Sequence, residues 1–335
     1  MADSKLVLFP KRSMSETFII CYLLSAICYS GLIINPASPD SMRILLCSEG
    51  TERSESAIQL CLKIAAATKS DVTIFGVTEL EADEGPLLEA IRRTQHSFMA
   101  RGVNVEILSK YGDPISEIEK RAVAGNYDLI VIGGEAKRGG RISVLSQKAY
   151  EIIETLFRPV LVVPVPRPEI RRILICSGGG TYIEAAIRLV IEFAPSLGAS
   201  VTLFTAVPES PVVISDRLEP EVDVSALLAS DSALGHNLRA EKEMIEAAGT
   251  PTEVRVRSGL VDAEIAAEIE AGDYDLVVLG SKPSRDVFSD YLLGNMTRRL
   301  VNWVPRPVLV VASEIGGQRP RSWLERITGR GGAEK

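Results

Sequence analysis

The chain has 335 residues, average apolar and charged fractions, few aromatic side chains and a formal net charge of −7. This acidic balance argues against a nucleic-acid partner, which would require a basic stripe or patch. Only two histidines occur, each alone in a helical stretch, so a histidine-based triad and a multi-histidine metal site are excluded. The five cysteines form no C-x-x-C pair and are typical of small buried side chains in a reducing compartment.

Residues 1–41 form an N-terminal extension with a composition of its own. Within it, Phe18–Ile34 is almost continuously apolar and follows three basic residues. Its length is about the minimum for crossing a bilayer. Two interpretations are open: a membrane anchor, or an upstream stretch before a true start at Met42, which we favour. The second interpretation predicts a cytoplasmic protein, and the first a membrane-anchored one.

A duplicated pattern organises the rest of the chain. The stretch NYDLIVIG at 126–133 recurs as DYDLVVLG at 273–280. An unbroken run of branched apolar residues after an acidic turn is typical of a strand buried on both faces of a parallel sheet. The stretch 44–48 likewise recurs at 173–177, and the second copy carries an insertion around 209–232. The repeat therefore predicts two homologous α/β units, called unit one and unit two below.

Each unit is expected to alternate strands and helices, beginning and ending with a strand. In unit one, apolar runs predict strands at 44–47, 72–77, 103–108, 126–133 and 160–163. Asp113-Pro114 predicts a helix start, because an aspartate N-cap is often followed by proline at the first helical position. Unit two repeats this order and ends with a strand at 308–311.

The repeat and the segments between its copies divide the chain into five parts. These are the hydrophobic extension 1–41, unit one at 42–164, a proline-rich linker at 165–170, unit two at 171–312, and a basic glycine- and arginine-rich tail at 313–335. Alternating prolines make the linker short, stiff and extended. The final strand of each unit would be an exposed sheet edge in isolation, and such edges tend to be covered or paired.

The turn after the first strand combines a carboxylate, a glycine and hydroxyls at a helix start, in the sequence SEGTERSESA at 48–57. With the Tyr-Asp-Leu central strand and the Pro-Val-Leu-Val-Val final strand, it resembles the universal stress protein family over both units. The resemblance implies two tandem, doubly wound, Rossmann-like domains, each a five-stranded parallel sheet in the order 3-2-1-4-5. It also implies that the final strands pair across a pseudo-two-fold axis, so that one chain mimics a dimer. A homodimer of whole chains is left open.

Some members of that family bind ATP between the first and fourth strands, with a phosphate loop of pattern G-x2-G-x9-G-[ST]. Its glycines let backbone amides approach the phosphates, and the helix that follows favours an anion at its N-terminus. Unit one keeps Glu49 on the base side and Gly133 at the loop start, but Ser146-Gln147 replaces the glycine–hydroxyl pair. In unit two, Gly178 aligns with Glu49, so the carboxylate is missing there.

The resemblance therefore implies an adenine-nucleotide site whose features are split between the units. We expect ATP or another adenine nucleotide in unit two. The expected contacts there are Gly280, Lys282, Gly294, Asn295 and Thr297, with Glu49 and Gly133 as the retained groups of unit one. The alternative at each place is an ordinary strand-to-helix turn that uses glycine for its conformation and Asn or Ser for capping. No metal site and no catalytic residue is expected.

The leading hypothesis is a tandem universal-stress-type protein, a non-catalytic stress-response or regulatory module that binds an adenine nucleotide. The rival hypothesis is an interaction or scaffold module that has lost nucleotide binding. A distant third rests on Ser177-Gly178-Gly179, which resembles the S-G-G-x-D-S loop of pyrophosphate-releasing, PP-loop-type ATP-dependent enzymes. That loop's aspartate and second serine are replaced here by Thr181 and Tyr182.

Overall fold

The computed structural model describes residues 41–134, 151–153, 156, 158–167, 169–178, 183–207, 223–281, 299–301 and 304–312. The apolar run Phe18–Ile34 lies outside these ranges. In the part of the chain that is described, no helix is both long and apolar enough to cross a membrane.

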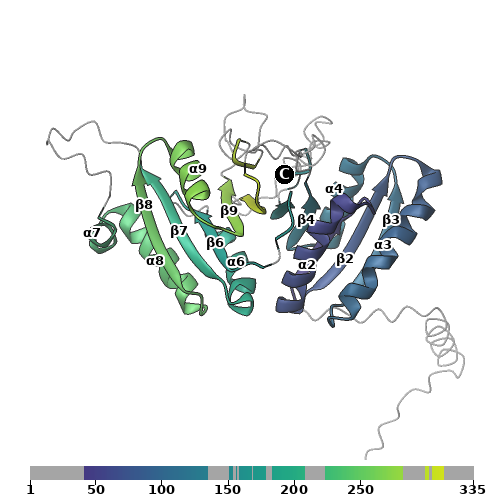
Figure 1. The fold of residues 1–335 in the computed structure, drawn as a ribbon, viewed down its shortest axis with the longest axis horizontal. Coiled ribbons are helices and arrows are strands. Elements are labelled where there is room, and N and C mark those ends of the chain that lie inside the picture. The colour runs from purple at the N-terminus through teal and green to yellow at the C-terminus, as the bar shows by residue number, and fades with distance from the viewer. Residues whose placement is uncertain are drawn as a thin grey trace, which may run out of the picture. The chain divides into compact units, whose positions relative to one another are not determined.

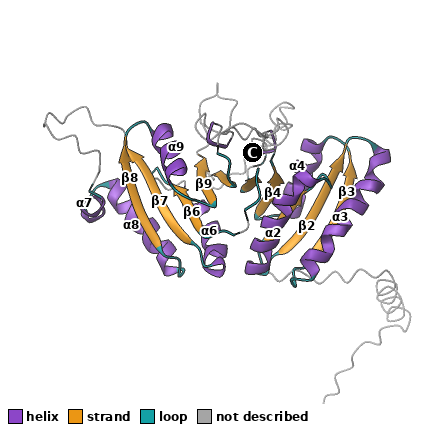
Figure 2. Ribbon diagram, in the orientation of Figure 1, coloured by secondary structure: helices purple, strands orange, loops and turns teal. Residues whose placement is uncertain are grey.

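The described residues contain a ten-stranded sheet, drawn in orange in Figure 2, with the order β3-β2-β1-β4-β5-β10-β9-β6-β7-β8. Unit one contributes β1 (Arg43–Cys47), β2 (Asp71–Thr78), β3 (Val105–Tyr111), β4 (Leu129–Gly133) and β5 (Val160–Val163). Unit two contributes β6 (Arg172–Cys176), β7 (Ser200–Val207), β8 (Thr252–Ser258), β9 (Leu276–Ser281) and β10 (Val308–Ala312). Neighbouring strands within a unit are parallel. Each unit therefore has the predicted strand order 3-2-1-4-5.

Helices cover both faces of this sheet (Figure 1). The helical segments are η1 (Glu52–Ser54), α2 (Glu55–Thr68), η2 (Glu81–Asp83), α3 (Glu84–Met99), α4 (Pro114–Gly125), α6 (Glu184–Leu197), α7 (Val224–Ala229), α8 (Ala233–Ala247) and α9 (Val261–Ala271). One apolar core lies between the sheet and α2, α3, α6 and α8, and a second between the sheet and α4 and α9. Helix α2 shows why these helices pack on the sheet: its apolar residues Ala57, Cys61 and Ile64 recur at helical spacing, so they form one face, and all three are fully buried.

The two units join through their final strands. β5 and β10 pair antiparallel, with Val160 opposite Val310, Leu161 opposite Leu309 and Val162 opposite Val308. All six side chains are at most 3% exposed. The prediction that these strands pair is confirmed, and pairing covers two apolar edges that would otherwise face water.

The aspartate of the repeated Tyr-Asp motif secures the start of each first strand. In unit one, the Arg43 backbone N–H donates to Asp128 Oδ2 at 2.8 Å. In unit two, Asp275 Oδ2 accepts from the backbone N–H groups of Arg171 at 2.8 Å and Arg172 at 3.0 Å. Because the aspartate precedes the fourth strand, these bonds fix the first and fourth strands beside each other at their amino ends.

The glycine two residues before each tyrosine is required by the aromatic ring. A Cβ atom on Gly125 would lie 2.1 Å from Tyr127 Cε2, and one on Gly272 would lie 2.0 Å from Tyr274 Cε2. No side chain fits at that distance. The repeated pattern Gly-x-Tyr-Asp is therefore a packing and hydrogen-bonding unit, located at the opposite ends of the strands from the loops that carry function in such sheets.

Two expectations about local structure are resolved differently. Asp113 Oδ2 accepts from the Ser116 N–H at 2.9 Å, so the predicted N-cap of α4 is confirmed. The third strand, expected at 103–108, runs from Val105 to Tyr111. Val103 instead closes the end of α3, donating its N–H to Phe98 O, while backbone pairing with β2 extends the strand through polar residues. Backbone pairing, which leaves no apolar signal, sets this boundary.

Candidate functional site

A cavity of about 630 Å³ opens at the carboxyl ends of β1, β2 and β4 in unit one. β1 pairs with both β2 and β4, so this is the place where the strand order reverses. The apolar part of the lining consists of Phe75, Val77, Leu80, Pro86, Leu87, Ala90, Pro114, Ile118, Ile132 and Ile152. The charged part consists of Glu49, Arg53, Glu79 and Asp83, all of which are exposed residues. An apolar body with a charged, water-facing edge is the usual form of a small-molecule site.

The turn after β1 places Glu49 at the edge of this cavity. The Glu49 backbone N–H donates to Ser54 Oγ at 3.1 Å, and the Gly50 N–H donates to Ser48 Oγ at 3.2 Å. Gly50 has φ +68°, and a Cβ atom there would lie 2.9 Å from Ala90 Cβ. The glycine therefore allows both the left-handed backbone and the close approach of α3, and the serines hold the turn in shape.

The glycines after β4 pack against neighbouring backbone. A Cβ atom on Gly133 would lie 3.1 Å from Arg53 O, and one on Gly134 would lie 2.9 Å from Pro164 Cα. Both glycines also line the cavity. Gly133 thus permits the close packing of η1 over the end of β4. An ordinary strand-to-helix turn would require the same glycine without any ligand.

The structure brings together two of the residues expected to bind a ligand. Glu49 and Gly133 both line the cavity, one from the turn after β1 and the other from the end of β4. In unit two, Gly280 lies near the end of β9, opposite Val311 of β10. The other expected contacts, Lys282, Gly294, Asn295 and Thr297, lie outside the described residues, as does the Ser146-Gln147 pair of unit one. The predicted phosphate contacts in unit two stay a prediction.

Unit two holds a carboxyl group at the carboxyl end of β6, although the turn that follows β6 has no acidic residue in place of Glu49. Ser177 follows β6 as Ser48 follows β1, and its Oγ donates to Glu241 Oε1 at 3.1 Å. Glu241 belongs to α8 and is 8% exposed. Burial raises the pKa of Glu241 to about 7, against a smaller opposing effect of the Ser177 bond. At this strand end, unit two has the Glu241 carboxyl from α8, whereas unit one has the Glu49 carboxyl from the turn after β1.

The sequence pattern around Glu241 could have indicated that this side chain is buried. Leu238 and Ile245, on the same side of α8, are fully buried. A glutamate between them at helical spacing occupies the inward face, where an ionisable side chain is exceptional and points to a specific partner. The partner itself, 64 residues earlier in the chain, could not be identified from spacing alone.

The described cysteines are thiols without nucleophilic character. Cys47 lines the cavity, and burial raises its pKa to about 12. Burial, assisted by the negative charge of Glu268, also raises the pKa of Cys176 to about 12. Both remain protonated at neutral pH. Among the residues that the structure describes, no group of three or more His, Cys, Asp or Glu side chains is arranged to hold a metal ion.

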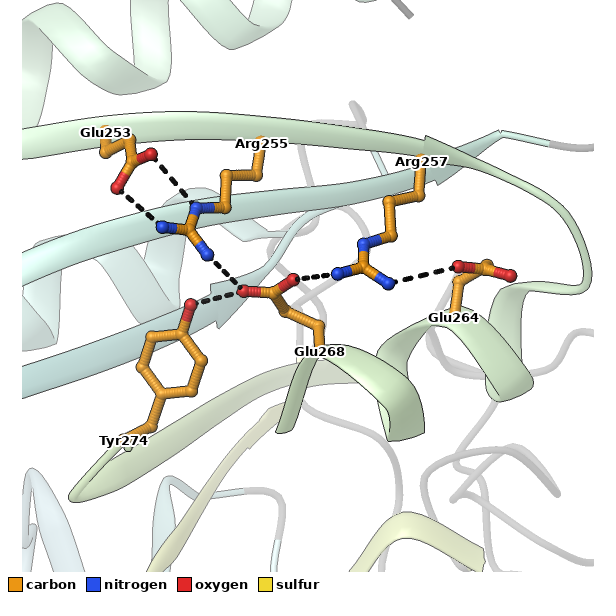
Figure 3. A network of polar contacts seen from close by, with 6 residues as sticks. All are labelled: Glu253, Arg255, Arg257, Glu264, Glu268 and Tyr274. Carbon is orange, nitrogen blue, oxygen red and sulfur yellow. Dashed lines mark hydrogen bonds and ion pairs between the residues drawn. The ribbon is translucent and has the colours of Figure 1, made fainter. Parts of the chain in front are cut away.

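A separate buried polar network in unit two joins α9, β8 and the tyrosine before β9 (Figure 3). Glu268 of α9 is fully buried and accepts from the Tyr274 hydroxyl at 2.5 Å. Arg255 and Arg257 of β8 reach its two carboxylate oxygens at 3.0 Å and 3.2 Å. Burial and the bond to Glu268 raise the pKa of Tyr274 to about 12. Since Tyr274 precedes β9, the network supports the amino end of that strand.

The described fold and its strand-end turns belong to a recognised class of protein. The model of the universal stress protein family matches residues 41–164 and again residues 169–312. The chain therefore belongs to the universal stress protein family, with two copies of its domain in tandem. No curated protein sequence matches the chain.

Solved structures agree on the fold. A universal stress protein from Archaeoglobus fulgidus DSM 4304 is 19% identical with a TM-score of 0.61, covering 82% of this chain and 99% of its own. A functionally unknown protein from Pseudomonas aeruginosa PAO1 is 16% identical with a TM-score of 0.62, covering 82% and 93%. The cytoplasmic domain of a prokaryotic cation chloride cotransporter is 12% identical with a TM-score of 0.51, covering 81% and 95%. At these identities the likeness concerns the fold, which does not by itself decide function.

Proposed function

We propose that this tandem universal stress protein is a non-catalytic stress-response or regulatory module that binds an adenine nucleotide such as ATP. The observation that carries the proposal is the cavity at the strand ends of unit one. Its volume of about 630 Å³ lies in the usual range for small-molecule sites. Its apolar side chains suit a flat base, and the Glu49 carboxylate at its edge suits a ribose hydroxyl or an exocyclic amine.

The chemistry of the described lining supports binding rather than turnover. Cys47, the thiol in the cavity, stays protonated because burial raises its pKa to about 12. The exposed carboxylates of the lining have no histidine or lysine among the described lining residues to act with them in proton transfer. A nucleophile with an adjacent base, the usual requirement for group transfer, is thus missing from this part of the lining.

Unit two is the second proposed location, because its sequence keeps more of the phosphate-binding pattern. There we propose contacts from Gly280, Lys282, Gly294, Asn295 and Thr297. Gly294 to Thr297 would present backbone amides and the Thr297 hydroxyl at a helix start, the arrangement that favours phosphate. The rival function, an interaction or scaffold module, predicts that neither unit binds a nucleotide.

A matched pair of substitutions separates these alternatives. Val77 lines the cavity of unit one, and Ala206 occupies the same position in β7 of unit two. Val77→Trp should fill the first cavity, and Ala206→Trp the equivalent place in the second unit. Calorimetric titration of ATP into each protein, with extraction of the purified chain to detect bound adenine, gives the measurement.

We expect Val77→Trp to remove binding in unit one while Ala206→Trp leaves that binding in place. Loss with Ala206→Trp alone would locate the ligand in unit two, as the phosphate-loop pattern suggests. No adenine in the extract and no heat with millimolar ATP would contradict the proposed function and favour the interaction module. Thermal melting of both variants controls for misfolding.

A further inference from the structure

The Glu241 carboxyl lies at the strand end of unit two that corresponds to the position of Glu49 in unit one. The turn after β6 has Gly178 at the position of Glu49, so it presents no acidic side chain of its own. The carboxyl of Glu241 reaches the same strand end from α8 and accepts from Ser177 Oγ at 3.1 Å. Ser177 is fixed in turn, because its carbonyl oxygen accepts from Thr205 Oγ1 at 2.7 Å. One oxygen of Glu241 is therefore held in a set direction.

The other oxygen of Glu241 has no hydrogen-bond partner among the residues that the structure describes. Glu241 is 8% exposed, and its Oε2 is buried. A buried polar atom left unpaired costs stability, which is why nearly all such atoms are paired in folded proteins. Protonation does not remove the cost, since a buried carboxylic acid has an O–H group that also requires an acceptor.

Position and burial together point to a ligand. The carboxyl end of β6, between β7 and β9, is the place in unit two where the strand order reverses. We propose that Glu241 Oε2 is a binding group of unit two and accepts a hydrogen bond from the exocyclic amine of adenine. This rests on the proposed function, which supplies the adenine ring as the ligand. Ser177 is the positioning residue of this contact.

The proposal predicts a choice between two nucleosides of nearly equal size. Adenosine presents an amine, a hydrogen-bond donor, where inosine presents a carbonyl oxygen, an acceptor. A carboxylate accepts from the amine and opposes the carbonyl. At pH 8, above the value of about 7 to which burial raises the pKa of Glu241, the carboxylate form predominates. Unit two should then prefer adenosine over inosine by about tenfold or more, the range for a hydrogen bond to a charged group.

The test uses the full chain carrying Val77→Trp, in which the cavity of unit one is filled. Adenosine and inosine are titrated calorimetrically at pH 8, with and without Glu241→Gln. Glutamine has nearly the same shape, but its amide places a donor where the carboxylate had an acceptor. The preference for adenosine should disappear or invert. Glu243→Gln in the same background is the matched control, because Glu243 lies on the same helix but is exposed, and it should leave the preference unchanged.

Two further results decide the matter. Ser177→Ala should weaken adenosine binding several-fold without unfolding the chain, because the carboxyl loses the bond that orients it. An unchanged adenosine preference in a folded Glu241→Gln protein overturns this inference, as does adenosine binding that Val77→Trp alone abolishes, and both leave the proposed function standing. Absence of nucleoside and nucleotide binding by the unsubstituted chain contradicts the proposed function and this inference together.

Discussion

The two units place a tyrosine at the same point before the fourth strand but give its hydroxyl opposite partners. In unit one, Tyr127 accepts from Arg121 Nε at 2.8 Å. In unit two, Tyr274 donates to Glu268 Oε1 at 2.5 Å. Arg121 and Glu268 occupy the same position in α4 and α9, so the charge is reversed. A phenol tolerates this reversal because its O–H group both donates and accepts.

The strand beside each tyrosine supplies the ionic partner of this helix residue, an acid in unit one and two cations in unit two. In unit one, Glu106 of β3 pairs with Arg121 at 3.1 Å, and both side chains keep substantial contact with water. In unit two, Arg255 and Arg257 of β8 pair with Glu268, whose side chain is fully buried. The same fold position thus holds a surface ion pair in one unit and a buried carboxylate in the other. The comparison teaches that the burial of an ion pair, rather than which residue carries which charge, decides how much stability is lost when the pair is broken.

The largest expected effect comes from removing the cations of unit two. Arg255→Met together with Arg257→Met leaves Glu268 buried without a compensating charge. The free energy of unfolding should fall by about 3–5 kcal/mol, measured by urea denaturation. In unit one, Arg121→Met removes a partly exposed pair and should cost about 1 kcal/mol or less.

Adding Glu268→Gln to the double variant is the control for this comparison. Glutamine carries no charge and still offers Tyr274 an acceptor, so most of the lost stability should return. Equal losses from the substitutions in the two units, or no recovery with glutamine, would show that burial of the carboxylate is not the cause.

The next largest effect is a pH dependence that unit two alone should contribute through Glu241. Burial raises its pKa from 4.5 to about 7, so the native state holds this proton more tightly than the unfolded chain does. Stability from this group is therefore fully present below pH 4.5 and is lost as pH rises to about 7, a change of about 3 kcal/mol. Glu241→Gln should remove this slope from denaturation curves measured between those pH values.

Glu49 of unit one provides the matched control for that slope. Its side chain is exposed at the cavity edge, so Glu49→Gln should leave the slope in place. A wild-type profile that parallels the Glu241→Gln profile throughout this range would contradict the assignment of the slope to Glu241.

The smallest effect concerns the helix starts of α4 and α9. Asp113 caps α4 by accepting from the Ser116 N–H at 2.9 Å. Leu260, at the same position before α9, provides no side-chain cap and is 76% exposed. Asp113→Leu should therefore cost about 1 kcal/mol, and Leu260→Asp should stabilise the protein by about 0.5–1 kcal/mol. Both are measurable as shifts in thermal midpoint, and a loss with Leu260→Asp would count against this comparison.

Repetition and apolar pattern made much of the fold predictable. Continuous apolar runs identified buried strands, and the pair Asp113-Pro114 located a helix start, because both signals are local in the chain. The polar end of β3 escaped prediction, since backbone pairing with β2 sets it rather than any apolar pattern.

The candidate site was less accessible to sequence reasoning. Glu49 and Gly133 were identified from a family-like pattern, and both line the cavity. The volume of a cavity depends on how side chains from several segments pack, which spacing in the chain does not encode. Glu241 and Glu268 show the same limit: each occupies an inward helix position, but its partners come from other elements, the turn after β6 for Glu241 and strand β8 for Glu268.

The antiparallel pairing of β5 with β10 has a consequence for synthesis of the chain. Val160 pairs with Val310, so about 150 residues must be added before the outer edge of β5 meets its partner. At typical translation rates of about 5–20 residues per second, unit one waits roughly 8–30 s on the ribosome with that edge open. The duration is set by translation rather than by the folding rate of unit one. With four residues, β5 offers other nascent chains a short template during that interval.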